Sequence, residues 1–253
     1  ERLALVGPSG GGKTTLCNLI PRFYEVTGGR ILIDGQDIQH VTLKSLREDI
    51  GIVQQDVYLF SGSVADNIAY GKPGATREEI IEAARLAGAE RFISALKDGF
   101  DTYVGERGVK LSGGQKQMIN LASVMAMNPD VLLLDEPLSQ LDPIASTQFI
   151  SLLVRINKEL GTTVIVAEHQ LGGLLSVVKR VVMLDNGKVC HDGDASSLTE
   201  HLSENNHPML FEMPAGVRAS ASVSNVLPLL DVPSAKNWYT SVSYTHLTLP
   251  TIA

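Results

Sequence analysis

The sequence predicts an α/β fold, in which strands of a parallel sheet alternate with helices and an extra block of helices is inserted. The first observation is a series of short apolar runs typical of buried strands, separated by helical patterns. These runs lie at residues 3–6, 131–134, 163–167 and 181–184. The second observation is a mostly helical pattern over about 60–128. With 253 residues, of which 44% are hydrophobic, the chain is long enough to bury a core.

The N-terminal part of the chain is predicted to form a strand, a loop, a helix and a hairpin. A glycine-rich stretch follows the strand at 3–6, and the helical pattern that begins at Lys13 stops at Pro21, which cannot continue a helix. The pair Asp34-Gly35 predicts a hairpin turn, and a further strand is expected at 50–54. The two hairpin strands are expected at 30–34 and 36–38.

End signals define the helices and turns further along the chain. Residues Thr76–Glu79 form a capping box, which opens a helix. A long helix is expected after Asp142, because this residue supplies an N-cap, Pro143 suits the first helical position and Gly161 suits the end. Asn186-Gly187 predicts a second hairpin turn.

The charge balance argues against some classes of partner. Lys and Arg together number 21 and Asp and Glu 28, which gives a formal net charge of −7. Because attraction to phosphates usually needs a basic excess, we expect no nucleic-acid partner and no direct binding to an anionic membrane. The apolar runs are also far too short to span a bilayer, so no transmembrane segment is predicted.

The glycine-rich loop carries the first functional motif. Its sequence, GPSGGGKT, matches the pattern GxxxxGK[ST] between a predicted strand and a predicted helix. Glycines let backbone N–H groups converge on phosphate oxygens, and the helix N-terminus adds its positive dipole end. Lys13 is expected to neutralise the β- and γ-phosphates, and the Thr14 hydroxyl is expected to bind Mg²⁺. The candidate nucleotide-binding residues here are Gly7, Ser9, Gly10, Gly11, Gly12, Lys13, Thr14 and Thr15.

A second part of the same site follows the apolar strand at 131–134. The strand delivers Asp135 to its C-terminal end, where the carboxylate is expected to join the Mg²⁺ shell. Glu136, the next residue, is expected to polarise an attacking water as a general base. Alone, this segment could equally be a core strand that ends in a solvated acidic turn. The phosphate loop earlier in the chain favours the functional interpretation.

The segment Leu111–Gln115, LSGGQ, completes the motif set. By itself it could be a helix cap with glycines for close packing. In this order and spacing with the other two motifs, it resembles the ATP-binding cassette (ABC) ATPases over about residues 3–203. The resemblance implies a P-loop NTPase (RecA-like) core with an inserted α-helical subdomain and an antiparallel β part truncated at the N-terminus. The ABC ATPase domain is then expected over 1–205, with its helical subdomain at about 60–128.

The resemblance also implies a head-to-tail dimer of two such domains, identical or related, with ATP bound between them. Ser112 and Gly114 of one domain are then expected to bind the γ-phosphate of the ATP that Lys13 of the other domain holds. The segment Ser139–Asp142 matches a loop that crosses the dimer interface. The candidate nucleotide-binding residues in this part of the chain are Ser112, Gly113, Gly114, Gln115 and Asp142.

Two further residues are assigned by the resemblance. Gln55 matches the glutamine that contacts Mg²⁺ or water and senses the membrane partner, with Gln54 as the alternative, and His169 matches the histidine that holds the γ-phosphate. The expected catalytic residues are Glu136, His169 and Gln55, and the expected Mg²⁺ ligands are Thr14, Gln55 and Asp135. The implied cofactors are ATP and Mg²⁺.

The implied membrane partner is the transmembrane domain or subunit of an ABC transporter. The ATPase domain is then expected to be cytoplasmic, peripheral on the cytoplasmic face of the plasma membrane. Membrane contact is expected only through the transmembrane partner.

The two parts of the domain resemble different subfamilies. Residues 1–117 are similar to exporters, notably at 60–68 and 102–108, whereas 118–205 are similar to ATPases of energy-coupling-factor importers and of proteins with two ATPase domains. The acidic Glu168 before the histidine is of the second type. We therefore hypothesise that the chain joins two genes at their shared LSGGQ coding region.

The ends of the chain are given no function. Residues 206–241 are expected to be a linker or a partial connector, and 242–251 resemble a translated sequencing adapter, so an artefactual tail is expected at 242–253. The first residues open directly in a strand-like run. We therefore expect an N-terminal truncation, with the adenine-stacking aromatic residue lying before Glu1.

Two other functions stay open at this point. One is a non-transport ABC ATPase that acts as a mechanical clamp on DNA or ribosomes, which the short helical block and the acidic charge disfavour. The other is a binding module without catalysis, if truncation or joining has spoiled the site. The transported substrate and the direction of transport are left undetermined, because the membrane partner selects the substrate.

Overall fold

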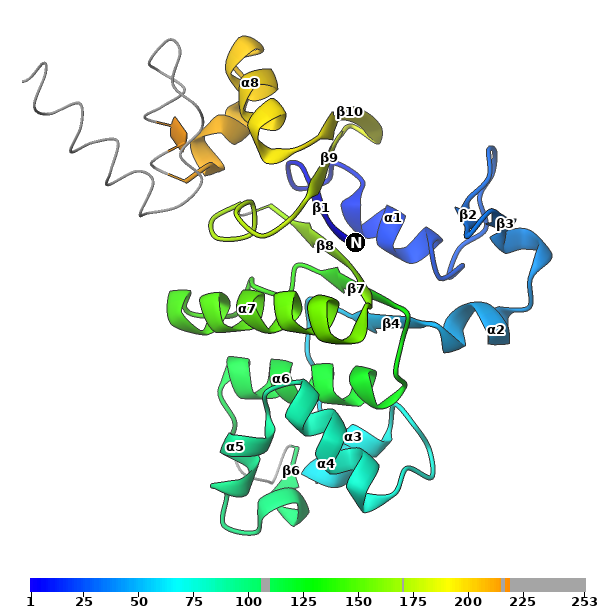
Figure 1. Ribbon diagram of the computed structural model, residues 1–253, viewed down its shortest axis with the longest axis vertical. Helices are drawn as coiled ribbons and strands as arrows, with labels where there is room; N and C mark the ends of the chain where they lie inside the picture. The colour runs from blue at the N-terminus through cyan, green and yellow to red at the C-terminus, as the bar shows by residue number, and fades with distance from the viewer. Residues whose placement is uncertain (106–109, 170, 215–216, 219–253) are drawn as a thin grey trace, which may run out of the picture.

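The computed structural model describes residues 1–105, 110–169, 171–214 and 217–218. Figure 1 shows a central sheet with helices on its faces and, at one end, a block that contains helices α3 to α6. The exporter-like residues 106–108 and the tail at 242–253 lie outside the described residues, as does most of the segment 206–241. Within the described part of the chain, no helix combines the length and hydropathy that crossing a bilayer requires.

The central sheet has the strand order β10-β9-β1-β8-β7-β4. Its strands are β1 (Arg2–Val6), β4 (Ile50–Val53), β7 (Val131–Asp135), β8 (Thr163–Glu168), β9 (Arg180–Asp185) and β10 (Lys188–Gly193). All neighbouring strands run parallel except β10, which is antiparallel to β9. The predicted α/β fold class is confirmed. Because the strands are parallel, the carboxyl ends of β1, β4, β7 and β8 meet at one edge of the sheet.

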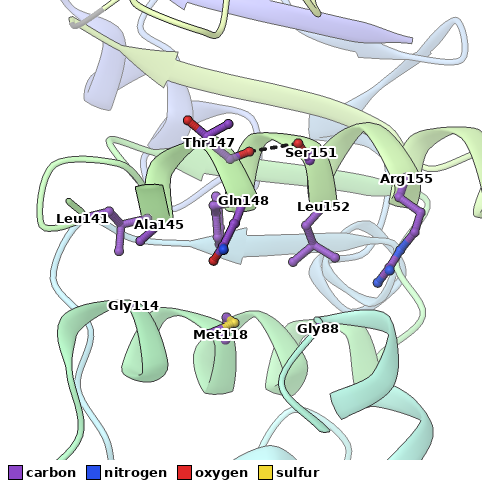
Figure 2. A pocket seen from close by; sticks show the side chains of 11 residues that line it. Gly88, Gly114, Met118, Leu141, Ala145, Thr147, Gln148, Ser151, Leu152 and Arg155 are labelled. Atoms are coloured by element: carbon purple, nitrogen blue, oxygen red, sulfur yellow. Dashed lines mark hydrogen bonds between the residues drawn. The ribbon is translucent and has the colours of Figure 1, made fainter. Parts of the chain in front are cut away.

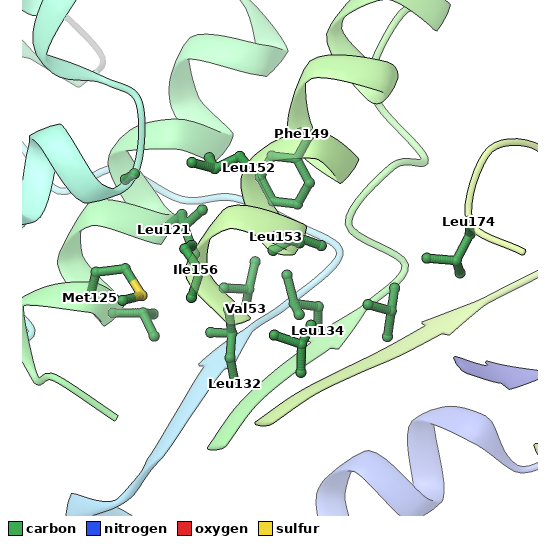
Figure 3. Packing of buried hydrophobic residues seen from close by; sticks show 14 of the residues in the cluster. Val53, Leu121, Met125, Leu132, Leu134, Phe149, Leu152, Leu153, Ile156 and Leu174 are labelled. Carbon is green, nitrogen blue, oxygen red and sulfur yellow. The ribbon is translucent and has the colours of Figure 1, made fainter. Parts of the chain in front are cut away.

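The sheet is buried on both faces, which explains its nearly continuous apolar strands. Leu132 and Leu134 of β7 belong to one hydrophobic cluster, whereas Leu133 and Leu5 belong to the cluster on the opposite face. This alternation follows from the two-residue period of a strand. Figure 3 shows the larger cluster, in which Val53, Leu132 and Leu134 lie close to Leu121, Phe149, Leu153 and Ile156 of the covering helices.

In its described part, the sheet region contains four α-helices, of which α1 and α7 were predicted from the sequence. They are α1 (Lys13–Leu19), α2 (Leu43–Glu48), α7 (Pro143–Leu160) and α8 (Ala195–Glu204), with 3₁₀ turns at Ile38–His40 and Pro208–Glu212. The carboxylate of Asp142 accepts the N–H groups of Ile144 and Ala145 at 2.9 Å each. Gly161 ends α7 in the left-handed conformation, with φ 77°. The predicted caps of this helix are confirmed.

The helical block consists of α3 (Val64–Ala69), α4 (Arg77–Leu86), α5 (Glu90–Ser94), a 3₁₀ turn (Gly99–Asp101) and α6 (Gly113–Ala126). Helix α6 packs against α3, α4 and β4. The predicted capping box at Thr76–Glu79 is present. Sequence analysis missed a short antiparallel pair within the block, β5 (Gly62–Ser63) with β6 (Tyr103–Val104). Two-residue strands that pair across such a separation leave no periodic pattern.

Both predicted hairpins are present. The first joins β2 (Leu32–Ile33) to β3 (Gln36–Asp37) and is shorter than expected. In the second, between β9 and β10, Asn186 has φ 49° and Gly187 has φ 73°. Positive φ at both central residues is the reason why an Asn-Gly pair is favoured in such turns.

Candidate functional site

The predicted phosphate loop lies between β1 and α1, at the carboxyl edge of the sheet. A Cβ atom on Gly7 would lie only 2.0 Å from the carbonyl oxygen of Leu184 in β9, so this position requires glycine. The carbonyl oxygen of Gly11 accepts the N–H of Gly187 at 3.0 Å. Strand β9 and the hairpin turn after it, which are distant in sequence, therefore contact the phosphate loop and support its conformation.

Lys13 is the first residue of α1 and is only 4% exposed. Its ammonium group donates hydrogen bonds to the carbonyl oxygens of Gly7 at 2.9 Å and Pro8 at 3.1 Å. No carboxylate among the described residues forms an ion pair with it. A buried charge without a counter-charge is costly, so the loop offers a positive charge that a bound anion would neutralise.

Thr14 and Asp135 meet because β7 ends beside α1. The Oγ1 hydroxyl of Thr14 donates to Oδ1 of Asp135 at 3.3 Å. Burial raises the pKa of Asp135 and the charge of Glu136 raises it further, while the bond from Thr14 and the charge of Lys13 act in the opposite direction. A hydroxyl and a carboxylate are the hard oxygen ligands that Mg²⁺ prefers, so this pair fits a magnesium site.

Glu136 and His169 follow β7 and β8 and come together at the same edge of the sheet. Glu136 has φ 47°, which is uncommon outside glycine, and its N–H donates to the carbonyl oxygen of Ala167 at 2.9 Å. Its Oε1 atom lies 3.5 Å from Nδ1 of His169. The side chains are 16% and 37% exposed, respectively. The site therefore places a carboxylate and an imidazole, both reachable from solvent, beside the Thr14–Asp135 pair.

The LSGGQ segment begins α6 in the helical block. The Ser112 hydroxyl accepts the N–H of Gln115 at 3.2 Å, and Oε1 of Gln115 accepts the N–H of Ser112 at 2.9 Å. Gln115, expected to bind nucleotide, thus caps its own helix. A Cβ atom on Gly113 would lie 2.9 Å from the carbonyl oxygen of Gln140, so α6 approaches the segment before α7 closely at this point.

The phosphate loop and the LSGGQ segment lie in different parts of the molecule. Helix α1 packs on β7 and β8, whereas α6 packs in the helical block. Among the described residues, no hydrogen bond or ion pair joins the two motifs. A pocket of about 450 Å³ lies between α6 and α7 beside the LSGGQ segment (Figure 2). Its lining includes Gly114, Met118, Leu141, Ala145, Leu152 and Arg155.

Comparison with known proteins identifies the family. Residues 1–139, more than half of the chain, match the family model for ABC transporters. The chain belongs to the ABC transporter family. With the parallel sheet and the phosphate loop, this membership identifies an ABC-type ATPase domain of P-loop NTPase fold, and it implies nucleotide binding.

The names of two relatives of this ABC domain refer to multidrug export and to lipid A-core flipping. The chain is 49% identical over 207 residues to a putative multidrug export ATP-binding/permease protein of Bacillus subtilis (strain 168), covering 82% of this chain and 35% of that protein. It is 48% identical over 204 residues to an ATP-dependent lipid A-core flippase of Syntrophus aciditrophicus (strain SB), covering 81% of this chain and 33% of the flippase. It thus spans about a third of the length of the curated relatives it matches.

A solved structure is also similar. It is a bacterial Atm1-family ABC exporter with ATP bound, which is 43% identical in sequence and superposes with a TM-score of 0.71. The match covers 79% of this chain and 35% of the exporter chain. Neither the proposed change of subfamily at LSGGQ nor the join of two genes is tested by these matches, and both stay predictions.

Several other predicted residues of the ABC site are exposed to solvent. They include Ser9, Thr15 and Gln55. Gln54, the alternative to Gln55, lines a groove of about 370 Å³ at the junction of the sheet and the helical block. Asp142 caps α7 and is also exposed. The choice between the two glutamines therefore stays open in the structure.

Sequence reasoning did not assign roles to two features that shape this site. One is the support of the loop by Leu184 and Gly187, whose only sequence signal is an Asn-Gly turn. The other is Glu168, which is 1% exposed and bonds the backbone after Glu136. An acidic residue directly after an apolar strand was the signal available for Glu168, but its contact could not be read from the sequence.

Proposed function

We propose that the chain binds and hydrolyses ATP as the nucleotide-binding domain of an ABC exporter, in a head-to-tail dimer that drives a transmembrane partner. The observation that carries this proposal is the convergence at one sheet edge of a buried ammonium, a hydroxyl–carboxylate pair and a carboxylate–imidazole pair. These groups come from α1, β7 and β8 and are far apart in sequence. Phosphoryl transfer to water needs chiefly positioning and charge neutralisation, which such a set supplies.

Each group has a role in the proposed reaction. Lys13 and the N–H groups of the loop would bind the β- and γ-phosphates, and Thr14, Asp135 and Gln55 would hold Mg²⁺. The metal would neutralise developing phosphate charge. Glu136 would orient a water molecule and accept its proton, and His169 would contact the γ-phosphate and orient the Glu136 carboxylate.

The second copy of the domain would supply the other wall of the ATP site. Ser112 uses a hydroxyl lone pair to cap α6, which leaves the hydroxyl proton free to donate to a phosphate oxygen. The N-terminal end of this 14-residue helix also carries a positive dipole end. Gly113, Gly114 and Asp142 would lie at the same interface. This arrangement explains why the two motifs need not be bonded within one chain.

The groove beside Gln54 is the proposed contact for the transmembrane partner. Tyr58, Phe60 and Tyr70 line it and are 79%, 55% and 66% exposed, so they form an exposed aromatic rim. Exposed aromatic clusters of this kind are typical of protein interfaces. Such docking would hold the domain on the cytoplasmic face of the membrane. The names of the relatives favour export, while the choice of substrate would rest with the membrane partner.

The decisive experiment replaces the proposed base. Glu136→Gln keeps the shape of the side chain but removes its basicity, so ATP affinity is expected to change less than about threefold while phosphate release falls by about 100-fold or more. Calorimetric titration with MgATP and a steady-state phosphate assay measure the two effects. Glu204→Gln, at the exposed end of α8, is the matched control. Phosphate release at the original rate in Glu136→Gln would remove this residue from its proposed role.

A further inference from the structure

The turn that carries Glu136 is fastened to β8 at two points. The N–H of Glu136 donates to the carbonyl oxygen of Ala167, and the N–H of Leu138 donates to Oε1 of Glu168 at 2.9 Å. Pro137, which lies between these two donors, has no N–H. The side chain of Glu168 therefore provides the second attachment of the turn. It binds the backbone at Leu138, two residues after the proposed base Glu136.

Glu168 is held in a setting where a carboxyl group is costly. The residue is 1% exposed, and its Oε2 atom is buried with no hydrogen-bond partner among the described residues. An apolar side chain of similar volume would avoid this cost. The hydrogen bond that its Oε1 atom accepts from the Leu138 N–H ties this acid to the turn that carries Glu136.

The backbone fastened by Glu168 is itself under local constraint. Glu136 adopts φ 47°, which is unfavourable for a side chain with a Cβ atom and persists where surrounding contacts hold it. Ser139 turns back on the same residue, since its N–H and its hydroxyl donate to the Glu136 carbonyl oxygen at 3.3 and 2.9 Å. Releasing Leu138 would leave this turn anchored to β8 through one bond.

We propose that Glu168 is a positioning residue for Glu136, acting through the hydrogen bond from Leu138 rather than by contact with ATP. The inference rests on the proposed function, in which Glu136 is the base. We call the hydrogen bond from Leu138 to Glu168 the clamp. It also fixes the direction in which the chain leaves β7 for the segment Ser139–Asp142. Glu168 thereby links the strand that precedes His169 to the backbone that follows the base.

The test compares three substitutions at this position in the full chain. Glu168→Gln keeps an acceptor oxygen, Glu168→Leu keeps similar volume without an acceptor, and Glu168→Asp keeps the carboxylate but withdraws it by one methylene. In Leu and Asp variants, amide exchange at Leu138 is expected to accelerate up to about tenfold, and in the Gln variant to stay near the original rate. Exchange is read by NMR or mass spectrometry without nucleotide. The Asp variant keeps the test available if the Leu variant does not fold.

The rate of ATP hydrolysis provides the second measurement. Loss of the clamp is expected to lower kcat by about tenfold or more while KM for ATP changes less than about twofold, and Glu168→Gln is expected to retain kcat. Unchanged Leu138 exchange in both Leu and Asp variants would overturn the proposal, and so would faster exchange with unchanged kcat. A wild-type chain without turnover would instead count against the proposed function, because the exchange measurement tests the clamp without ATP.

Discussion

At the scale of single residues, the site is defined by charges that the fold keeps out of water. The Lys13 ammonium is surrounded by carbonyl oxygens of its own loop, and Glu168 sits behind the turn that carries Glu136. Burial raises the pKa of the Glu168 carboxyl group, so its charged form is stabilised less inside the protein than in solvent. In the proposed function, the buried ammonium of Lys13 would bind an anionic ligand. The buried carboxyl group of Glu168 binds the backbone at Leu138.

Removal of the Lys13 charge should therefore weaken nucleotide binding. We expect Lys13→Ala to raise the dissociation constant for MgATP by about tenfold or more, because charge-assisted hydrogen bonds contribute about 1.5–3 kcal/mol each. Lys158→Ala, on the exposed face of α7, removes a charge elsewhere and should leave the affinity unchanged. Calorimetric titration decides the matter, and equal affinity in Lys13→Ala and the wild type would contradict the assignment of the phosphate loop.

Glu168 should also make stability depend on pH. Burial raises its pKa from 4.5 to about 7, and the charge of Glu136 adds to this, while bonds from the Leu138 and His169 backbone and the charge of Lys13 oppose it. Between these two pKa values the folded chain binds a proton that the unfolded chain has lost. Stability is therefore expected to fall as pH rises through this window, by up to about 3 kcal/mol, and then to level off.

Glu168→Gln cannot titrate at this position, so it isolates the contribution of the Glu168 carboxyl group. Thermal unfolding of both proteins at several pH values between about 5 and 8 measures the difference between their stabilities. We expect the difference to shift steadily in favour of the Gln variant as pH rises. Parallel curves would show that Glu168 does not change its protonation on unfolding in this range.

At the scale of elements, short local signals set where helix α7 begins and ends. Helix α7 has an N-cap at Asp142, proline at its first position and a left-handed glycine after its last residue. These features satisfy backbone groups that would otherwise lack partners. The helix places Phe149, Leu153 and Ile156 on the sheet (Figure 3), and their helical spacing in the sequence determines which face enters the core.

The cap at Asp142 can be weighed by substitution. Asp142→Ala removes the acceptor for two N–H groups and is expected to lower the free energy of unfolding by about 1 kcal/mol. Asp142→Asn keeps a capping oxygen and should cost only a few tenths of that. Urea denaturation of the three proteins gives the values. Equal stability of the wild type and the Ala variant would show that the carboxylate does not cap α7 in solution.

At the scale of the whole molecule, the fold separates two motifs that the proposed reaction needs together. The phosphate loop belongs to the sheet, and LSGGQ belongs to the helical block beyond the pocket in Figure 2. Arg155 of α7 donates to the carbonyl oxygen of Leu86 at 3.2 Å and so ties the block to the sheet region. A head-to-tail second copy would bring the two motifs together without rearranging either part.

Dimer formation should therefore be sensitive to a negative charge introduced at position 112. In a Glu136→Gln background, which is expected to bind ATP without hydrolysing it, MgATP is expected to convert monomers to dimers in light scattering. Adding Ser112→Asp keeps a good N-cap but places a negative charge beside the γ-phosphate, and should prevent dimers. Adding Ser112→Asn keeps the cap without the charge and should allow them. Dimers that persist with Asp at this position would contradict the proposed interface.

The sequence by itself determined the α/β fold class, the main strands and the caps of α7, and it predicted the residues that would bind the phosphates. Apolar strands, caps and Asn-Gly turns act over a few residues, so their consequences can be predicted from neighbours in the chain. The loop at Gly7 to Thr14 is a local motif of this kind, whereas the pair Asp135-Glu136 is interpreted as functional only together with that loop. Their common sheet edge followed from strands expected to run parallel.

Only the tertiary structure decided how these pieces are held. The close approach of Leu184 to Gly7, the bond from Leu138 to Glu168 and the pairing of β5 with β6 all join residues far apart in the chain. Such contacts depend on which strands become neighbours and in what register, and no local pattern encodes that. Glu168 illustrates the difference: the sequence shows an acid before a histidine, and the folded chain shows which N–H it binds.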